Sequence, residues 1–205
     1  MRPESLDYMT SFVPLKSSED VDFQMPSTKS SNEECGVAFQ PWFLDHVRTS
    51  LVKKDFSSLY FTVGLVEEVA ELMEEKQKNS PDDSSVVSEV GDVCWYIYGL
   101  CHSLNDILPT TIKSKSDVSN LSPLGDEAAQ ALLLCGKLCG SVKKWNRGDQ
   151  NWDQFRERIQ KDVSDVLGVL ASISPVPLEV AMKKNIEKIQ SRRERNVVKG
   201  DGSDR

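Results

Sequence analysis

The stretch from Gly64 to Leu100 constrains the fold more than any other part of the chain. It contains two runs with helical periodicity, residues 64–75 and 88–98, which a polar break at 78–85 separates. The apolar positions fall on one side of each run: Leu65, Val69, Leu72 and Met73 in the first, and Val90, Val93, Cys94 and Ile97 in the second. Because a short connection makes two helices antiparallel neighbours, this stretch predicts a helical hairpin.

Acidic residues occur at the same spacing in both runs. Glu68 and Glu71 are three positions apart, as are Glu89 and Asp92, so each pair lies on one helix face, about one turn apart. Four carboxylates that converge from facing helices repel one another unless a cation lies among them. Because hard oxygen ligands suit Mg²⁺ or Mn²⁺, the pattern predicts a metal site.

The paired motifs resemble those of the MazG-like, all-α nucleoside triphosphate pyrophosphohydrolases. The similarity consists of Glu68-x-x-Glu71, seventeen intervening residues (72–88) and Glu89-x-x-Asp92, with similar flanking text, and it extends over most of residues 40–205. It implies a metal-dependent hydrolysis of a nucleoside triphosphate between the α and β phosphates, which releases the monophosphate and pyrophosphate. Glu67 is then the candidate general base or an acid that supports the metal ligands.

Residues of the last and of the first predicted helix are expected to contact the substrate. Asn185-x-x-Lys188 and the glycine-rich residues 199–205 resemble the family's carboxy-terminal helix and tail. In the family, the first helix can contact the base, which makes Trp42 and His46 candidates for stacking or edge contacts. The outer phosphates would be held either by Lys143, Lys144 and Arg147 or by Lys188 and Arg192. Asn185, which shares a helix face with Lys188 and Arg192, is a further candidate for binding the substrate.

The second half of the chain weakly repeats the first. When the halves are aligned, Lys137 matches Glu68, Gly140 matches Glu71, Asp162 matches Glu89, and Asp165 matches Asp92. The second copy lacks the first pair of acids and carries lysines nearby. We therefore expect one catalytic hairpin and one structural, cationic hairpin, which together build a four-helix core within one chain.

The expected fold class is an all-α antiparallel bundle of the MazG-like type with two pseudo-repeated hairpins. Helices are predicted near residues 41–54, 57–78, 84–102, 126–147, 152–173 and 176–195, with a loop at 103–124. Residues 1–38 are predicted to be a disordered or loosely docked arm, 39–195 the helical domain, and 196–205 a flexible tail. The expected apolar positions of the last two units are Leu132, Cys135, Leu138, Cys139, Val142, Val180, Ile186 and Ile189.

Composition narrows the classes of partner. The net charge of -7 and the isoelectric point near 5.0 argue against a nucleic acid polymer as the ligand. The five cysteines form no CxxC pair, which favours free thiols in a reducing compartment. No secretory signal and no membrane-length apolar run is visible, so we expect a cytoplasmic protein without a membrane partner. A homodimer remains possible.

Other interpretations stay open on the sequence alone. The acids could form a solvated helix face stabilised by Lys76 and Lys78. The chain could also be a catalytically silent scaffold or dimerisation module that kept the fold. A third alternative is a narrow-substrate relative that hydrolyses dCTP, dUTP or phosphoribosyl-ATP, because base preference depends on the shape of the pocket.

Overall fold

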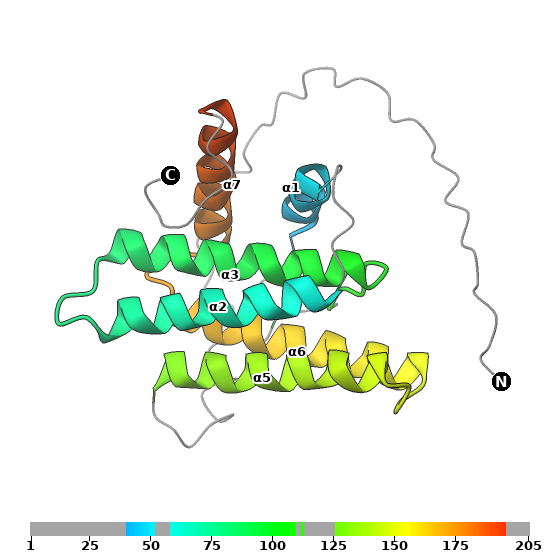
Figure 1. Ribbon diagram of the computed structural model, residues 1–205. Helices are drawn as coiled ribbons and strands as arrows, with labels where there is room; N and C mark the ends of the chain where they lie inside the picture. Colours follow the sequence, from blue (N-terminus) through cyan, green and yellow to red (C-terminus); the bar gives the residue numbers. More distant parts are fainter. Residues whose placement is uncertain (1–39, 52–57, 110–111, 113–125, 196–205) are drawn as a thin grey trace, which may run out of the picture. The chain divides into compact units, whose positions relative to one another are not determined.

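Six α-helices and no strand occur in the residues that this computed structural model describes, namely 40–51, 58–109, 112 and 126–195 (Figure 1). The helices are α1 (Pro41–Leu51), α2 (Ser58–Gln77), α3 (Asp83–Ser103), α5 (Glu127–Asn146), α6 (Trp152–Ile173) and α7 (Leu178–Glu194). The all-α prediction is therefore confirmed for these residues. The predicted arm at 1–38, the end of the first helix, most of the 103–124 loop and the tail lie outside the described residues.

Side-chain hydrogen bonds close the turn between α2 and α3. Asp82 caps α3, because its carboxylate accepts hydrogen bonds from the backbone nitrogens of Ser84 and Ser85, both at 3.2 Å. Glu75, buried at the end of α2, accepts from the backbone nitrogen of Asp82 at 3.4 Å and from the Lys78 ammonium. The two helices consequently run antiparallel and pack along their length (Figure 1).

Glycines let α2 and α3 approach closely. A Cβ atom on Gly64 would lie 2.0 Å from the ring of Tyr96, and one on Gly99 would lie 2.2 Å from the ring of Phe61. Each glycine therefore leaves room for an aromatic ring of the other helix. This close packing fixes how the polar faces of the two helices oppose each other.

The second hairpin, α5–α6, packs against the first. Asn151 and Gln154 form a capping box at the start of α6, and Trp145 stacks on Phe155 with ring centroids 4.8 Å apart. Cys139 of α5 donates a hydrogen bond through Sγ to the Thr62 carbonyl of α2 at 3.6 Å. The four helices share one hydrophobic core, as expected, while the repeat relation between the hairpins remains a prediction.

Helices α7 and α1 both pack on α3. A Cβ atom on Gly91 would lie 2.8 Å from the Ala181 carbonyl oxygen, so only glycine permits α7 to come this close. The aromatic rings of Phe43 in α1 and Tyr98 in α3 have centroids 4.9 Å apart. Helix α7 thereby reaches the polar face of the first hairpin.

Two predicted apolar faces are wrong in part. In α5, Leu132 is exposed and Cys139 is half-buried, while Ala131 and Leu134 lie in the core. In α7, Val180 is exposed, and the buried residues are Leu178, Ala181, Met182 and Asn185. Which apolar residues a helix buries depends on the neighbouring helices, and close packing also brings small residues such as Ala131 and Ala181 into the core.

The remaining sequence-based expectations concern cysteines and membrane spans. The described cysteines are free: Cys94, Cys101 and Cys135 are buried, and Cys139 is half-buried. Within the described ranges, no single helix is long and apolar enough to cross a membrane. Only α6 and α7 taken together, with a 91° bend between them, reach that length and composition.

Candidate metal centre

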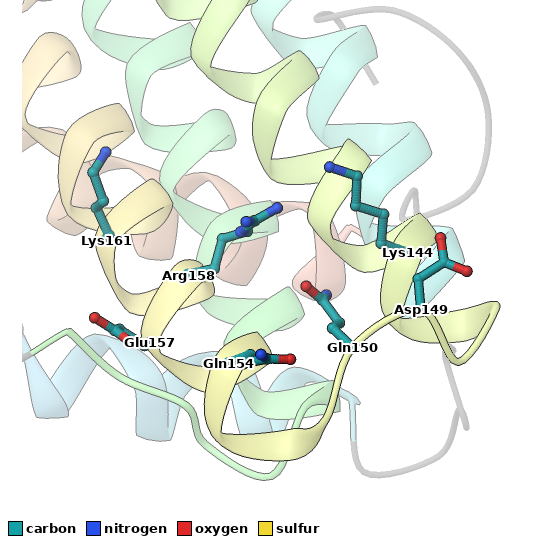
Figure 2. Close-up of a pocket in the computed structure, with 7 residues that line it drawn as sticks. All are labelled: Lys144, Asp149, Gln150, Gln154, Glu157, Arg158 and Lys161. Atoms are coloured by element: carbon teal, nitrogen blue, oxygen red, sulfur yellow. The ribbon is translucent and has the colours of Figure 1, made fainter.

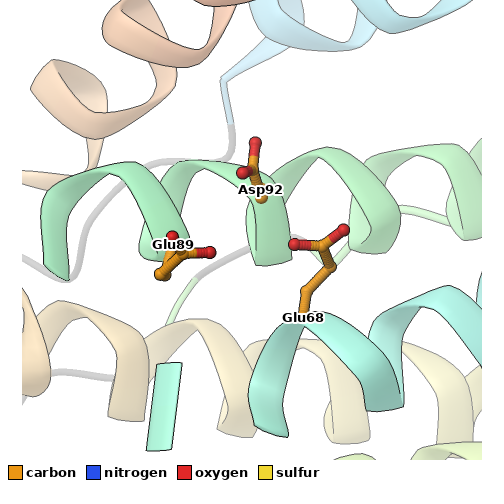
Figure 3. A group of neighbouring side chains, drawn as sticks. All are labelled: Glu68, Glu89 and Asp92. Carbon is orange, nitrogen blue, oxygen red and sulfur yellow. The ribbon is translucent and has the colours of Figure 1, made fainter. Parts of the chain in front are cut away.

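Three of the four predicted metal ligands come together on the first hairpin. Glu68 of α2 and Glu89 and Asp92 of α3 each offer a carboxylate oxygen, and these oxygens all lie within 4.8 Å of one another (Figure 3). All three residues are partly buried. Glu71, the fourth predicted ligand, is exposed and lies outside this group, although its charge raises the pKa of Glu68 and Glu89. We call Glu68, Glu89 and Asp92 the carboxylate cluster.

The carboxylate cluster carries more negative charge than its surroundings balance. Burial, together with the charges of Asp92, Glu71 and Glu89, raises the pKa of Glu68 to about 8, and the charge of Lys188 acts in the opposite direction. Burial and the charge of Asp92 raise the pKa of Glu89 to about 7, and Lys188 again acts in the opposite direction. When carboxyl groups retain protons near neutral pH, a cation that replaces these protons stabilises the ionised carboxylates.

Helix α7 supplies two further polar groups. Asn185 donates a hydrogen bond through Nδ2 to Asp92 Oδ1 at 2.5 Å, and Lys188 donates from Nζ to Asp92 Oδ2 and, at 3.0 Å, to Ser88 Oγ. Asn185 is only 2% exposed, and its Oδ1 atom has no hydrogen-bond partner among the described residues. Because buried polar atoms are normally satisfied, this oxygen indicates a missing donor or cation beside Asp92.

The residues present fit a hard divalent cation. Carboxylate and amide oxygens are the ligands that Mg²⁺ and Mn²⁺ prefer, and no sulfur or imidazole ligand belongs to the carboxylate cluster. Oxygens around Mg²⁺ at about 2.0–2.1 Å are neighbours about 3 Å apart. Glu68, Glu89 and Asp92 are therefore the residues that would hold the ion.

Two polar neighbours of the cluster were not predicted from the sequence, namely Ser88 and Tyr96. Ser88 precedes Asp92 by four residues and Tyr96 follows it by four, so both share its helix face. Burial, a hydrogen bond with Tyr60 and the charges of Glu68 and Glu67 raise the pKa of the Tyr96 phenol. Four-residue spacing from Asp92 was the signal that could have identified both side chains.

Glu67, the predicted general base, is exposed and does not belong to the carboxylate cluster. It directly precedes Glu68, and its charge acts on Tyr96, so it lies at the solvent side of the same site. An exposed carboxylate in that position can exchange protons with water.

The predicted base contacts lie on α1. Trp42 is half-buried, and its Nε1 atom donates a hydrogen bond to Gln40 Oε1 at 2.8 Å. His46 stacks on Phe43 with centroids 6.4 Å apart, and burial followed by the charge of Arg193 lowers its pKa. The influence of Arg193 shows that this face of α1 lies near the end of α7, where the partly buried Arg192 also lies.

The predicted phosphate ligands of the second hairpin lie far from the carboxylate cluster. Helices α2 and α5 are antiparallel (Figure 1). They meet at the hydrogen bond from Cys139 Sγ to the Thr62 carbonyl. At 1.5 Å per residue, Glu68 lies about 9 Å along α2 from that contact, and Lys144 lies about 7.5 Å along α5 in the opposite direction. The structure therefore does not bring Lys143, Lys144 or Arg147 to the acids.

Lys144 instead lines an open pocket of about 620 Å³ between α5 and α6 (Figure 2). Its other lining residues are all polar: Asp149, Gln150, Gln154, Glu157, Arg158 and Lys161. Arg147 is ion-paired with Asp149. These cations of the second hairpin thus lie beside polar residues of the same hairpin.

Comparison with known proteins returned no match to a family model, to a curated protein or to a solved structure. In the described part of the chain, fold and site together define a helical protein with a candidate divalent-metal centre on its first hairpin.

Proposed function

We propose that this protein is a metal-dependent nucleoside triphosphate pyrophosphohydrolase. The observation that carries the proposal is the convergence of Glu68, Glu89 and Asp92 from two facing helices. The resemblance to MazG-like enzymes rests on the spacing of these residues in the chain. The buried amide of Asn185 supports it independently, because it belongs to the second resembling segment and contacts Asp92.

The carboxylate cluster would hold Mg²⁺ or Mn²⁺. When bound, the ion would neutralise phosphate charge and lower the pKa of a water molecule at the site. Glu71 is the candidate for a further ligand, since its charge acts on both Glu68 and Glu89 and its exposed side chain can turn toward them. Asn185 would keep the Asp92 carboxylate in a fixed orientation through its hydrogen bond.

Other side chains would bind the substrate and transfer the proton. Lys188 and Arg192, two cations on the face of α7 that approaches α3, would hold the outer phosphates. Glu67 is the candidate acceptor of the proton from the attacking water. Trp42 and His46 on α1 are the candidates for contact with the base, where an aromatic face can stack on it.

The test is a product analysis on the purified chain. With Mg²⁺ and a panel of ribo- and deoxyribonucleoside triphosphates, we expect equal amounts of monophosphate and pyrophosphate, and no product with EDTA. Glu68→Gln should lower kcat/KM by about 100- to 1000-fold. Glu74→Gln, which removes the same charge from an exposed position of the same helix, should not. Release of orthophosphate, or full activity of Glu68→Gln, would contradict the proposal.

A further inference from the structure

The ammonium group of Lys188 occupies a position beside the carboxylate cluster that a metal ion would compete for. Lys188 belongs to α7, yet its Nζ atom donates to Oδ2 of Asp92, one of the three cluster residues. Ser88, one turn earlier on α3, accepts a second hydrogen bond from the same Nζ at 3.0 Å. The side chains of Lys188 and Asp92 are only 23% and 19% exposed, so the pair is largely shielded from solvent.

Neighbouring contacts hold the helix that carries this lysine in place. Asn185, one turn earlier on α7, donates to Oδ1 of Asp92, so that both oxygens of this carboxylate accept from α7. Gly91 keeps the two helices close together, because its missing side chain lets the Ala181 carbonyl approach. The lysine can therefore leave Asp92 by a change of side-chain rotamer, whereas the helix that carries it is fixed by packing.

The charge of Lys188 also acts on the two glutamates of the cluster. It lowers the pKa of both Glu68 and Glu89, in opposition to burial and to the other acids. One positive charge faces three clustered carboxylates, so a divalent ion would compensate the acids more fully than the lysine does. Lys188 nevertheless donates a hydrogen bond to Oδ2 of Asp92, an oxygen that the ion would need as a ligand.

We propose that Lys188 is a resident counter-ion that competes with the divalent metal for Asp92, so that loading of the site requires its ammonium to leave this carboxylate. The inference rests on the proposed function only in treating the carboxylate cluster as a metal site. The lysine would thus lower the affinity for the bare ion. An anionic phosphate that accepts the displaced ammonium would favour loading, which couples metal binding to substrate binding.

The first test compares Mn²⁺ dissociation constants, measured by calorimetry or by paramagnetic resonance of the free ion, without nucleotide. Lys188→Gln removes the competitor and should bind Mn²⁺ about tenfold more tightly than the unmodified protein. Lys183→Gln removes the same charge from an exposed position of α7 and should change the constant less than about twofold. An affinity of Lys188→Gln equal to or weaker than that of the unmodified protein would overturn the inference.

A second variant retains every charge. Ser88→Ala removes one of the two acceptors of Lys188, so it should strengthen Mn²⁺ binding by about twofold to threefold and should also fold normally. Failure of Lys188→Gln to fold would leave Ser88→Ala as the deciding variant, and unchanged binding there would contradict the competition.

The outcomes also separate this inference from the proposed function. Suppose that Glu68→Gln abolishes Mn²⁺ binding but neither Lys188→Gln nor Ser88→Ala strengthens it. The competition by Lys188 is then refuted, while the proposed metal centre stands. If neither the unmodified protein nor the test variants bind Mn²⁺, both ideas are wrong. If only Lys188→Gln and Ser88→Ala bind it, the lysine blocks the site completely, which supports the inference.

Discussion

The two helical hairpins differ in how their acidic residues are neutralised. In α2–α3, Glu68, Glu89 and Asp92 lie together, and the groups that compensate them come from α7, more than 90 positions away in the chain. In α5–α6, Asp162 accepts a hydrogen bond from Ser141 at 2.8 Å, and Asp165 pairs with Lys161 at 2.7 Å. Those partners lie within the same hairpin.

This difference separates a structural acid from a candidate functional one. Asp165 is 1% exposed and has a cation one turn away, so its charge is compensated where it is buried. Glu68 lies among like charges, which destabilise its ionised form. The acid pairing of the second hairpin stabilises the fold, whereas the acids of the first hairpin remain available to bind a cationic ligand.

Exchanging one acid in each hairpin for its amide should give opposite results. Glu68→Gln should lower kcat/KM by about 100- to 1000-fold, because it removes a charge that would hold the metal, while stability is kept or increased. Asp165→Asn should leave kcat/KM within about twofold but destabilise the protein by about 1–3 kcal/mol, since Lys161 loses its partner. Steady-state kinetics and urea unfolding of both variants check this.

The result that would undo the comparison is equal loss of turnover in the two variants. In that case the second hairpin would also contribute to the reactive site. Retained stability in Asp165→Asn would show instead that the Lys161 pair contributes little to folding.

Glycine replacement tests how each hairpin depends on close packing. Gly91→Ala should push α7 away from α3, because the new Cβ would lie 2.8 Å from the Ala181 carbonyl oxygen. Since Asn185 and Lys188 would shift with the helix, we expect about a tenfold loss of kcat/KM together with a destabilisation of about 1–3 kcal/mol.

The matched control is Gly136→Ala in α5, where a Cβ atom meets nothing within 4 Å. It should leave activity unchanged and stabilise the protein by up to about 1 kcal/mol, because alanine favours the helix. Full activity of Gly91→Ala would mean that the position of α7 does not matter for turnover.

The pH dependence of stability should report the unbalanced charge of the first hairpin. The pKa of Glu68 is raised from 4.5 to about 8, so between these values the folded protein binds more protons than the unfolded chain. Stability of the metal-free protein should therefore fall as pH rises from about 5 to 8, by a few kcal/mol. Denaturant unfolding in EDTA checks this, and Glu68→Gln should flatten the slope whereas Asp165→Asn should not.

The smallest effect is expected for Lys144→Ala. Lys144 lies on the opposite side of the Thr62–Cys139 contact from Glu68, so both KM and kcat should stay within about twofold of their original values. Lys188→Ala, by contrast, should raise KM clearly because it removes a cation beside Asp92. A rise in KM for Lys144→Ala similar to that for Lys188→Ala would show that the second hairpin reaches the substrate.

The sequence predicted the helices well, since their periodicity and caps are local properties. The predicted helix at 152–173 has the bounds of α6, and the other helix ends that lie within the described residues differ from prediction by a few residues at most. The same local argument placed Glu68, Glu89 and Asp92 on faces that meet, because a short turn leaves two helices little freedom of orientation.

Contacts between distant segments were harder to predict. Asn185 was identified through its resemblance, but the residues expected to form the apolar side of α7 were Val180, Ile186 and Ile189. The buried face instead contains Ala181 and Asn185, because it must fit against Gly91 of α3. Which stripe a helix buries depends on the surface it meets, which its own sequence does not contain.

By itself, the sequence determined an all-α chain with two hairpins and an acidic pattern suited to a divalent cation, since spacing along a helix converts directly into position on its face. Only the tertiary structure decided that α7 brings Asn185 and Lys188 to Asp92 and that Lys144 lies away from the acids. The reason is physical. Electrostatic and hydrogen-bond partners interact over a few ångströms, and packing alone sets those separations for residues far apart in the chain.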